Sequence, residues 1–211
     1  MNSKVTHINV GNLAENCWFL ANEDTKEAVV IDPGAEPDRI CAAAEKHGWK
    51  ITAILLTHGH IDHMGACESL RIELGVKVYA LTEEEDLLLD AKKNLSVFIE
   101  RKVVTFEPDE LLRDGQELTL AGMKIQVIHT PGHTEGGTCY YIESIGVLFS
   151  GDTLFCESVG RTDFPGGSMS DIVHSIKDKL MVLPDDTKVY TGHGEGTSIG
   201  YERVHNPFIG A

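Results

Sequence analysis

The chain has 211 residues and a formal net charge of −15, and 42% of its residues are hydrophobic. This length suits one domain with a sizeable core. The negative charge argues against nucleic acid and anionic membrane surfaces as partners, because both bind a basic protein face. No apolar run approaches the roughly 20 residues of a membrane helix. The N-terminus lacks the pattern of a secretory signal, so we expect a cytoplasmic protein.

The five cysteines include no Cys-x-x-Cys pair. An odd number without such pairs argues against a disulfide framework and against a cysteine-rich zinc ribbon. We therefore expect most of these cysteines to be small buried hydrophobic residues. A reactive thiol at Cys156 is a weaker alternative.

The first part of the chain alternates short apolar runs with turns and helical segments. Strands are predicted at residues 5–10, 18–21, 28–31, 51–56 and 76–80. Helices are predicted at residues 37–46, 64–74 and 82–89, the last of them capped by Thr82. Residues 94–113 mix charged and apolar side chains without a clear period, so they predict neither element.

A second set of strands follows this ambiguous segment. Strands are predicted at residues 116–120, 124–128, 138–142, 147–150 and 188–191. A helix is predicted at residues 169–181, with Ser168 or Ser170 as its cap. Two sets of strands, each accompanied by helices, predict an α/β architecture of two sheets packed face to face with helices outside.

A cluster of metal-ligand side chains follows the predicted strand 51–56. His58, His60, Asp62 and His63 occupy four positions within six residues. Imidazole and carboxylate are ligands for zinc and its first-row neighbours. A solvated polar loop is the alternative, but three histidines so close together favour a metal site.

Three further residues of these types, His133, Asp152 and His193, each follow a predicted strand and lie beside glycine, which lets the backbone approach a site closely. Seven ligands are too many for one tetrahedral zinc. They suit two metals about 3.5–4 Å apart, which share a carboxylate and lower the pKa of bound water toward about 7. The sequence thus predicts hydrolysis of a carbonyl or phosphoryl bond. The other histidines are interpreted as structural or surface residues: His7, His47, His129, His174 and His205.

The H-x-H-x-D-H pattern of residues 58–63 resembles that of the metallo-β-lactamase superfamily, and the three later residues follow in the family's order. Residues 32–34, Asp-Pro-Gly, resemble the family's first motif, in which the aspartate is structural. The resemblance covers essentially the whole chain and implies a four-layer αββα sandwich. It implies a first metal held by His58, His60 and His133, a second held by Asp62, His63 and His193, and a bridging Asp152.

Residues 151–155 and 160–167 look like those of compact glyoxalase II-like thioester hydrolases. This resemblance implies one domain over residues 1–211, without the C-terminal helical domain that binds glutathione in longer members. It implies hydrolysis of a small thioester, S-lactoylglutathione or a related acyl thiol, by a metal-bridging hydroxide that Asp62 orients. Two divalent metals are expected, zinc first, with iron or manganese as alternatives. Arg161 is a candidate substrate-binding residue, although we favour a brace formed with Asp163.

The nearest rival is a persulfide dioxygenase, which would hold a single iron through His58, His133 and Asp152, a facial triad. Lactonase and β-lactamase activities rank next, because the fold permits them but the loops do not suggest them. A nuclease ranks lower still, and a binding module without turnover is disfavoured by an intact set of seven ligands. No oligomeric state follows from the sequence.

Overall fold

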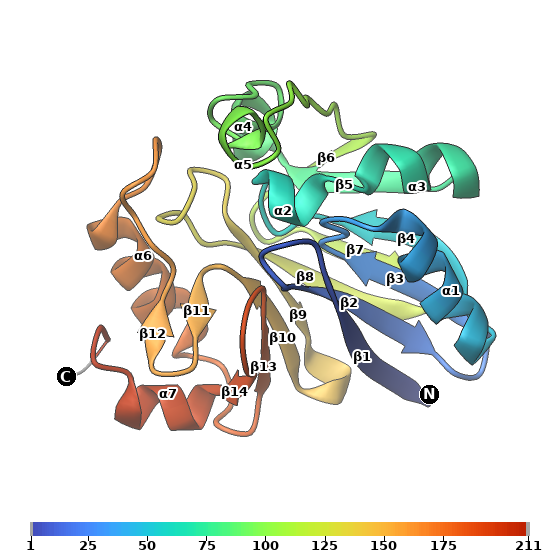
Figure 1. The fold of residues 1–211 in the computed structure, drawn as a ribbon. Helices are drawn as coiled ribbons and strands as arrows, with labels where there is room; N and C mark the ends of the chain where they lie inside the picture. Colours follow the sequence, from blue (N-terminus) through green and yellow to red (C-terminus); the bar gives the residue numbers. More distant parts are fainter. Residues whose placement is uncertain (1, 210–211) are drawn as a thin grey trace.

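The computed structural model describes residues 2–209, and Figure 1 shows two sheets lying face to face. The first sheet has the order β1-β2-β3-β4-β5-β6 and the second has the order β14-β13-β10-β9-β8-β7. The strands of the first are β1 (Ser3–Val10), β2 (Glu15–Asn22), β3 (Glu27–Ile31), β4 (Lys50–Leu55), β5 (Lys77–Leu81) and β6 (Glu110–Leu112). Those of the second are β7 (Glu117–Leu120), β8 (Met123–His129), β9 (Thr138–Ile142), β10 (Val147–Gly151), β13 (Lys188–Thr191) and β14 (Thr197–Ser198). A separate hairpin pairs β11 (Leu154–Phe155) with β12 (Ser158–Val159).

The helices cover the two outer faces of the sheets (Figure 1). The first sheet is covered by α1 (Pro37–His47) and α3 (Cys67–Leu74). The second is covered by α6 (Met169–Ser175), its π-helical continuation (Ile176–Leu180) and α7 (Ile199–His205). Three short helices, α2 (Ile61–Met64), α4 (Glu85–Leu88) and α5 (Ser96–Ile99), and two 3₁₀ turns, Thr82–Glu84 and Glu143–Ile145, complete the described elements. No helix of residues 2–209 is both long enough and apolar enough to cross a membrane.

Strand β2 shows how the sequence forms these layers. All of its residues are buried, so its side chains serve both faces of the sheet. Phe19 packs into the cluster under α1 and α3, whereas its neighbours Trp18 and Leu20 pack into the cluster between the sheets. On the second sheet, Tyr140 faces the space between the sheets and Tyr141 faces α6. The predicted four-layer αββα sandwich is therefore confirmed.

Two predicted helices are divided in the structure. The segment predicted as 64–74 begins earlier, at Ile61, and is interrupted where the N–H of Ala66 donates to the oxygen of Pro33 (2.9 Å). The segment predicted as 82–89 becomes a 3₁₀ turn and α4, and the Thr82 hydroxyl donates to the oxygen of Leu112 (2.8 Å). The prediction that Thr82 caps a helix is therefore wrong. By contrast, Ser168 caps α6 by accepting from the N–H of Asp171 (3.2 Å).

Candidate metal centre

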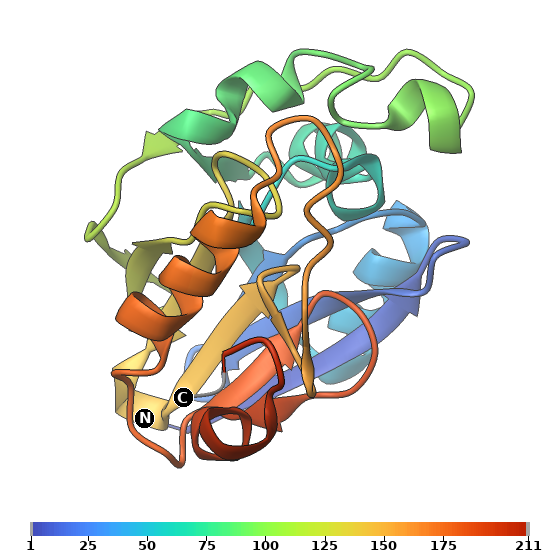
Figure 2. The same cartoon turned by 90° about the vertical axis from the view of Figure 1, so that its left-hand side faces the viewer.

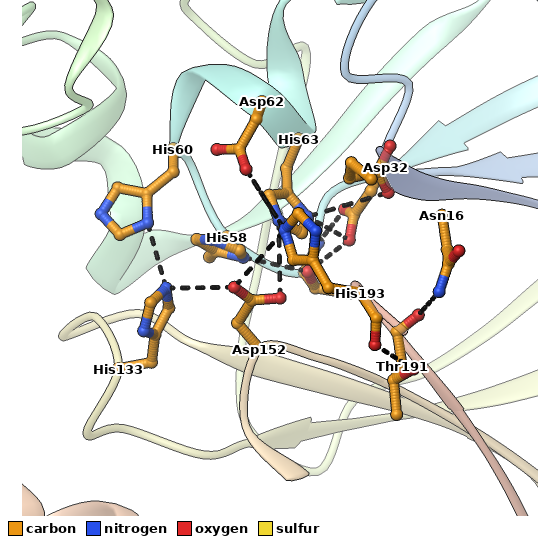
Figure 3. A network of polar contacts seen from close by, with 12 residues as sticks. Asn16, Asp32, His58, His60, Asp62, His63, His133, Asp152, Thr191 and His193 are labelled. Carbon is orange, nitrogen blue, oxygen red and sulfur yellow. Dashed lines mark hydrogen bonds and ion pairs between the residues drawn. The ribbon is translucent and has the colours of Figure 1, made fainter. Parts of the chain in front are cut away.

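All seven predicted ligand residues lie together at one end of the two sheets (Figure 3). The first four belong to the loop after β4 and to α2, so the early start of this helix places both Asp62 and His63 on one helical turn. The other three follow β8, β10 and β13 of the second sheet: His133, Asp152 and His193. Each sheet thus contributes one side of the site.

His58, His60 and His133 form the first group. The Nδ1 atom of His60 lies 3.0 Å from the Nε2 atom of His133. The ring of His58 lies 4.8 Å, centroid to centroid, from each of the other two rings and edge-on to both. Two nitrogens that share a tetrahedral zinc at about 2.0–2.1 Å are separated by about 3.3 Å. The spacing of these nitrogens therefore fits a shared metal ion.

Asp62, His63 and His193 form the second group. The Nε2 atoms of His63 and His193 are 3.3 Å apart, and that of His193 is 3.2 Å from Oδ2 of Asp62. Asp152 reaches both groups, since its Oδ1 is 3.5 Å from Nε2 of His63 and its Oδ2 is 3.7 Å from Nε2 of His133 (Figure 3). This is the arrangement that a carboxylate bridging two ions requires.

The charges at the site favour bound cations. Burial lowers the pKa of His58 well below its usual value, and burial with the neighbouring His133 lowers the pKa of His60 to about 3, so both rings are neutral. Burial acts in the same direction on His63, but the carboxylates of Asp152 and Asp62 outweigh it and raise the pKa of His63 well above its usual value. Neutral imidazoles are ready to ligate a metal. The carboxylates of Asp152 and Asp62, which raise the pKa of His63, would equally attract a bound metal cation at this place.

Hydrogen bonds outside the cluster orient the ligand rings. Asp32 accepts from Nδ1 of His63 (3.0 Å) and from both the N–H and the hydroxyl of Thr57 (2.7 and 2.5 Å). Nδ1 of His133 donates to the backbone oxygen of Arg161 (2.8 Å). Both rings therefore present Nε2 to the cluster, the arrangement by which neighbouring acceptors fix a metal-binding tautomer. Asp32 also lies close to His58 and His63, but its hydrogen bonds assign it an orienting role.

The orphaned polar atoms of the site provide a further test of the metal fit. Nε2 of His58 and Oδ1 of Asp152 are buried and have no hydrogen-bond partner within the protein. Buried polar atoms are otherwise almost always paired. The donor set of imidazole nitrogens and carboxylate oxygens is suited to zinc, iron and manganese. The residues present therefore fit divalent metal ions.

Glu84 is a structural residue that the sequence did not reveal. Its fully buried carboxylate accepts from the N–H of Gly59 (2.8 Å), the N–H of Gly136 (2.8 Å) and the hydroxyl of Thr134 (2.9 Å). It thereby joins the loop of His58 and His60 to the loop of His133. Burial raises the pKa of Glu84 to about 7 in spite of these hydrogen bonds.

Replacing Glu84 with glutamine is expected to change how stability depends on pH. Because the folded-state pKa of Glu84 rises from its usual 4.5 to about 7, its contribution to stability is complete below pH 4.5 and is lost as the pH rises through 7. The difference in unfolding free energy between wild type and Glu84→Gln should therefore fall by about 2 to 3 kcal/mol between pH 5 and pH 8. Urea unfolding of the metal-free proteins measures this difference. Glu83, the exposed neighbour of Glu84, provides the control variant Glu83→Gln. If the difference in unfolding free energy between wild type and Glu84→Gln did not change with pH, the prediction would be wrong.

The loop of His193 is held by the start of the chain. The side-chain amide of Asn16 donates to the oxygens of Thr191 (3.0 Å) and Gly194 (3.1 Å), and the indole of Trp18 donates to the same Thr191 oxygen (2.9 Å). Figure 3 shows the Asn16 side chain pointing toward Thr191. The first sheet therefore positions a ligand loop of the second.

The remaining sequence candidates lie outside the cluster. His129, for example, donates from Nε2 to the oxygen of Glu135 (2.8 Å), as expected for a structural histidine. Among the described residues, none of the five histidines set aside above belongs to a group that could hold a metal. Burial and the nearby Glu202 raise the pKa of the Cys156 thiol, which disfavours the thiolate. Arg161 pairs with Asp163 through two hydrogen bonds of 2.7 Å, as the brace requires, and its contact with substrate stays a prediction.

Comparison with known proteins agrees with this geometry. The family model of the metallo-beta-lactamase superfamily matches residues 10–193. The hydroxyacylglutathione hydrolase GloC of Haemophilus influenzae is 36% identical over 197 residues, 92% of each chain. The crystal structure of the BLEG-1 B3 metallo-beta-lactamase has a TM-score of 0.93 and 39% identity, and covers 99% of this chain and 100% of its own. That of TTHA1623 in a di-iron-bound form has a TM-score of 0.85 and 36% identity, over 96% and 99% of the two chains. This chain therefore belongs to the metallo-β-lactamase superfamily.

Proposed function

We propose that the protein is a metal-dependent hydrolase that cleaves a small thioester, S-lactoylglutathione or a related acyl thiol. The observation that carries the proposal is the pair of ligand groups joined by Asp152, which together would hold two divalent metals. The first would be held by His58, His60 and His133, the second by Asp62, His63 and His193. A relative of similar length is named hydroxyacylglutathione hydrolase, which supports this substrate class.

When bound, two such metals would supply a water of lowered pKa and would polarise the carbonyl group of the substrate. Burial alone would raise the pKa of Asp62, but His63 and His193 outweigh it and lower that pKa. The Asp62 carboxylate therefore stays ionised, and it lines the cavity into which the site opens. In this position it accepts a hydrogen bond from the attacking water and orients it toward the carbonyl carbon.

The lining of the cavity favours a carboxylic thioester over a phosphate ester. Most of its residues outside the cluster are apolar, and its two cationic residues are Lys92 and Arg161. Arg161 is already paired with Asp163. Two metals would serve either kind of bond, but sites that bind a phosphoryl group gather further donors or cations around its oxygens, and the lining outside the ligands offers few.

Metal removal and restoration tests the proposal. We expect chelation to abolish hydrolysis of S-lactoylglutathione, followed by the loss of thioester absorbance, and zinc, iron or manganese to restore it with up to two ions per chain. Metal analysis of the restored protein gives the stoichiometry. Failure of every metal-loaded form to hydrolyse S-lactoylglutathione and other small acyl thiols would overturn the proposal.

Two rival activities require parallel assays. A persulfide dioxygenase would hold a single iron through His58, His133 and Asp152, residues that this site also contains, so metal content and parallel assays must separate it from the hydrolase. Oxygen uptake with glutathione persulfide at one iron per chain would replace our proposal. One similar structure is named a B3 metallo-beta-lactamase. Hydrolysis of a chromogenic cephalosporin without any thioester turnover would favour that activity instead.

A further inference from the structure

The cavity at the metal centre is larger and more apolar than a lactoyl group requires. Its volume is about 930 Å³, within the upper part of the range of about 300–1,000 Å³ that is typical of small-molecule sites. Five of the seven clustered residues line it, so a ligand in the cavity touches the reaction centre. Its apolar lining includes Leu13, Leu95, Phe98, Ile99, Phe155 and Phe164.

One side of this cavity is formed by α5 and the residue before it, which we call the α5 wall (Leu95, Phe98 and Ile99). Phe98 is 68% exposed, although large apolar side chains are usually removed from water. Figure 2 shows the segment of α4 and α5 along the top of the molecule, near the loop that leads to α6. Phe98 therefore contributes little to the core and is available to a ligand.

The α5 wall is held in a defined position. The side-chain amide of the buried Asn94 donates to the oxygen of Val104 (2.8 Å) and its Oδ1 accepts from the N–H of Ser96 (3.0 Å), while the Ser96 hydroxyl also donates to Val104 (3.2 Å). The backbone oxygen of Asn94 accepts from the N–H of Ile61, the first residue of α2 (2.9 Å). The wall is thus attached to the helix that carries Asp62 and His63. Such pre-organisation limits the entropy lost when a ligand binds.

Lys92 provides the available positive charge of the cavity. Arg161, the other cationic residue of the lining, is paired with Asp163, and its guanidinium lies 4.0 Å from the centre of the Phe164 ring. The backbone N–H of Lys92 donates to Oδ1 of Asp90 (2.8 Å), but among residues 2–209 its ammonium forms no ion pair comparable with that of Arg161 and Asp163. In a chain of net charge −15, an anionic ligand is repelled unless a local cation offsets the charge.

We infer that the substrate is an amphipathic acyl thiol, whose apolar acyl chain lies against the α5 wall and whose thiol half carries a carboxylate that pairs with Lys92. This inference rests on the thioester hydrolysis proposed above. It assigns specificity to residues outside the metal cluster and selects an apolar acyl group over a hydroxylated one such as lactoyl.

The acyl chain is tested with a series of thioesters of one thiol, 3-mercaptopropionate, from acetyl to octanoyl. The value of kcat/KM should rise by about twofold per added methylene, less than the roughly fourfold expected for complete burial, because the cavity is open. Phe98→Ser should flatten the series, lowering kcat/KM for the octanoyl thioester by a larger factor than for the acetyl thioester. Phe208, another exposed phenylalanine, lies outside the cavity lining and provides the control, Phe208→Ser. A flat series in the wild type would overturn the inference.

The anion is tested by comparing these substrates with acyl thioesters of N-acetylcysteamine, which carry no charge. Lys92→Gln should raise KM for the anionic series by about two- to fivefold, the range of an exposed ion pair, and should change KM for the neutral series by a smaller factor. The wild-type preference should weaken at high salt. Lys93 lines a separate small cavity and serves as the matched control, Lys93→Gln. Equal effects of Lys92→Gln on both series would contradict the role of Lys92.

A binding measurement separates failure of this inference from failure of the proposed reaction. S-alkyl derivatives of 3-mercaptopropionate are thioethers that cannot be hydrolysed, and their affinity can be measured by calorimetry. We expect the affinity to rise with alkyl length and to fall in Phe98→Ser and Lys92→Gln. This expectation concerns binding alone, so it holds even if the protein hydrolyses a bond other than a thioester. Turnover of thioesters without any dependence on chain length or on Lys92 would leave the reaction standing and refute the inferred specificity.

Discussion

Replacement of Asp152 by asparagine is expected to lower kcat/KM by at least about a hundredfold, beyond the ten- to hundredfold cost of losing a group that only orients a ligand. The Asp152 carboxylate is within 3.5 Å of His63 and 3.7 Å of His133, and so reaches both ligand groups. Asparagine has nearly the same shape but no charge and a single oxygen acceptor. It cannot offer an oxygen to each of two cations. Bound metal should fall from two ions per chain to one or none, as measured by metal analysis after dialysis.

A matched control separates this effect from a general loss of acidic charge. Asp114 forms an ion pair with Lys179 (2.8 Å) outside the metal-type groups, so Asp114→Asn removes the same charge at a distance from the site. We expect that variant to bind and turn over like wild type. If Asp152→Asn retained two metals and wild-type kcat/KM, the assignment of a bridging carboxylate would be wrong.

The residues that form the candidate metal centre could be predicted because their signal is local. Each follows an apolar strand, so a short window reveals both the ligand type and its place at a strand end. Glu84 gives no such signal, since it belongs to an acidic run that is typical of an exposed helix. Its three donors come from residues 25 to 52 positions away along the chain, which only the folded backbone brings together.

The segment that the sequence left ambiguous has a physical explanation. Residues 94–113 show no regular apolar period because several of their apolar side chains face a cavity rather than the core. Period-based prediction assumes that apolar side chains mark the buried face of an element. Phe98 breaks that assumption, and the four-residue α5 that carries it is too short to show a helical period.

The glycine in the Asp-Pro-Gly turn provides the second large expected effect, a loss of stability together with a loss of metal. A Cβ atom at Gly34 would lie 1.5 Å from the backbone oxygen of Asp62 and 2.5 Å from its carbonyl carbon. A backbone group cannot rotate out of the way, so α2 must move. Gly34→Ala should therefore cost about 3 kcal/mol or more, the upper part of the range for overpacking. Thermal unfolding should shift downward by about 6–12 °C for a chain of this size.

The matched control is Gly75→Ala, because Gly75 has open space around its Cβ position and only a left-handed φ of +65°. Its expected cost is about 1–2 kcal/mol from backbone strain alone. Metal binding separates the two variants further. Moving the Asp62 backbone alters the 3.2 Å approach between its carboxylate and His193, so Gly34→Ala should also weaken metal binding, whereas Gly75→Ala should not. Equal melting temperatures and equal metal contents in the two variants would show that α2 can move at little energetic cost. The close contact between Gly34 and the Asp62 backbone would then not position Asp62.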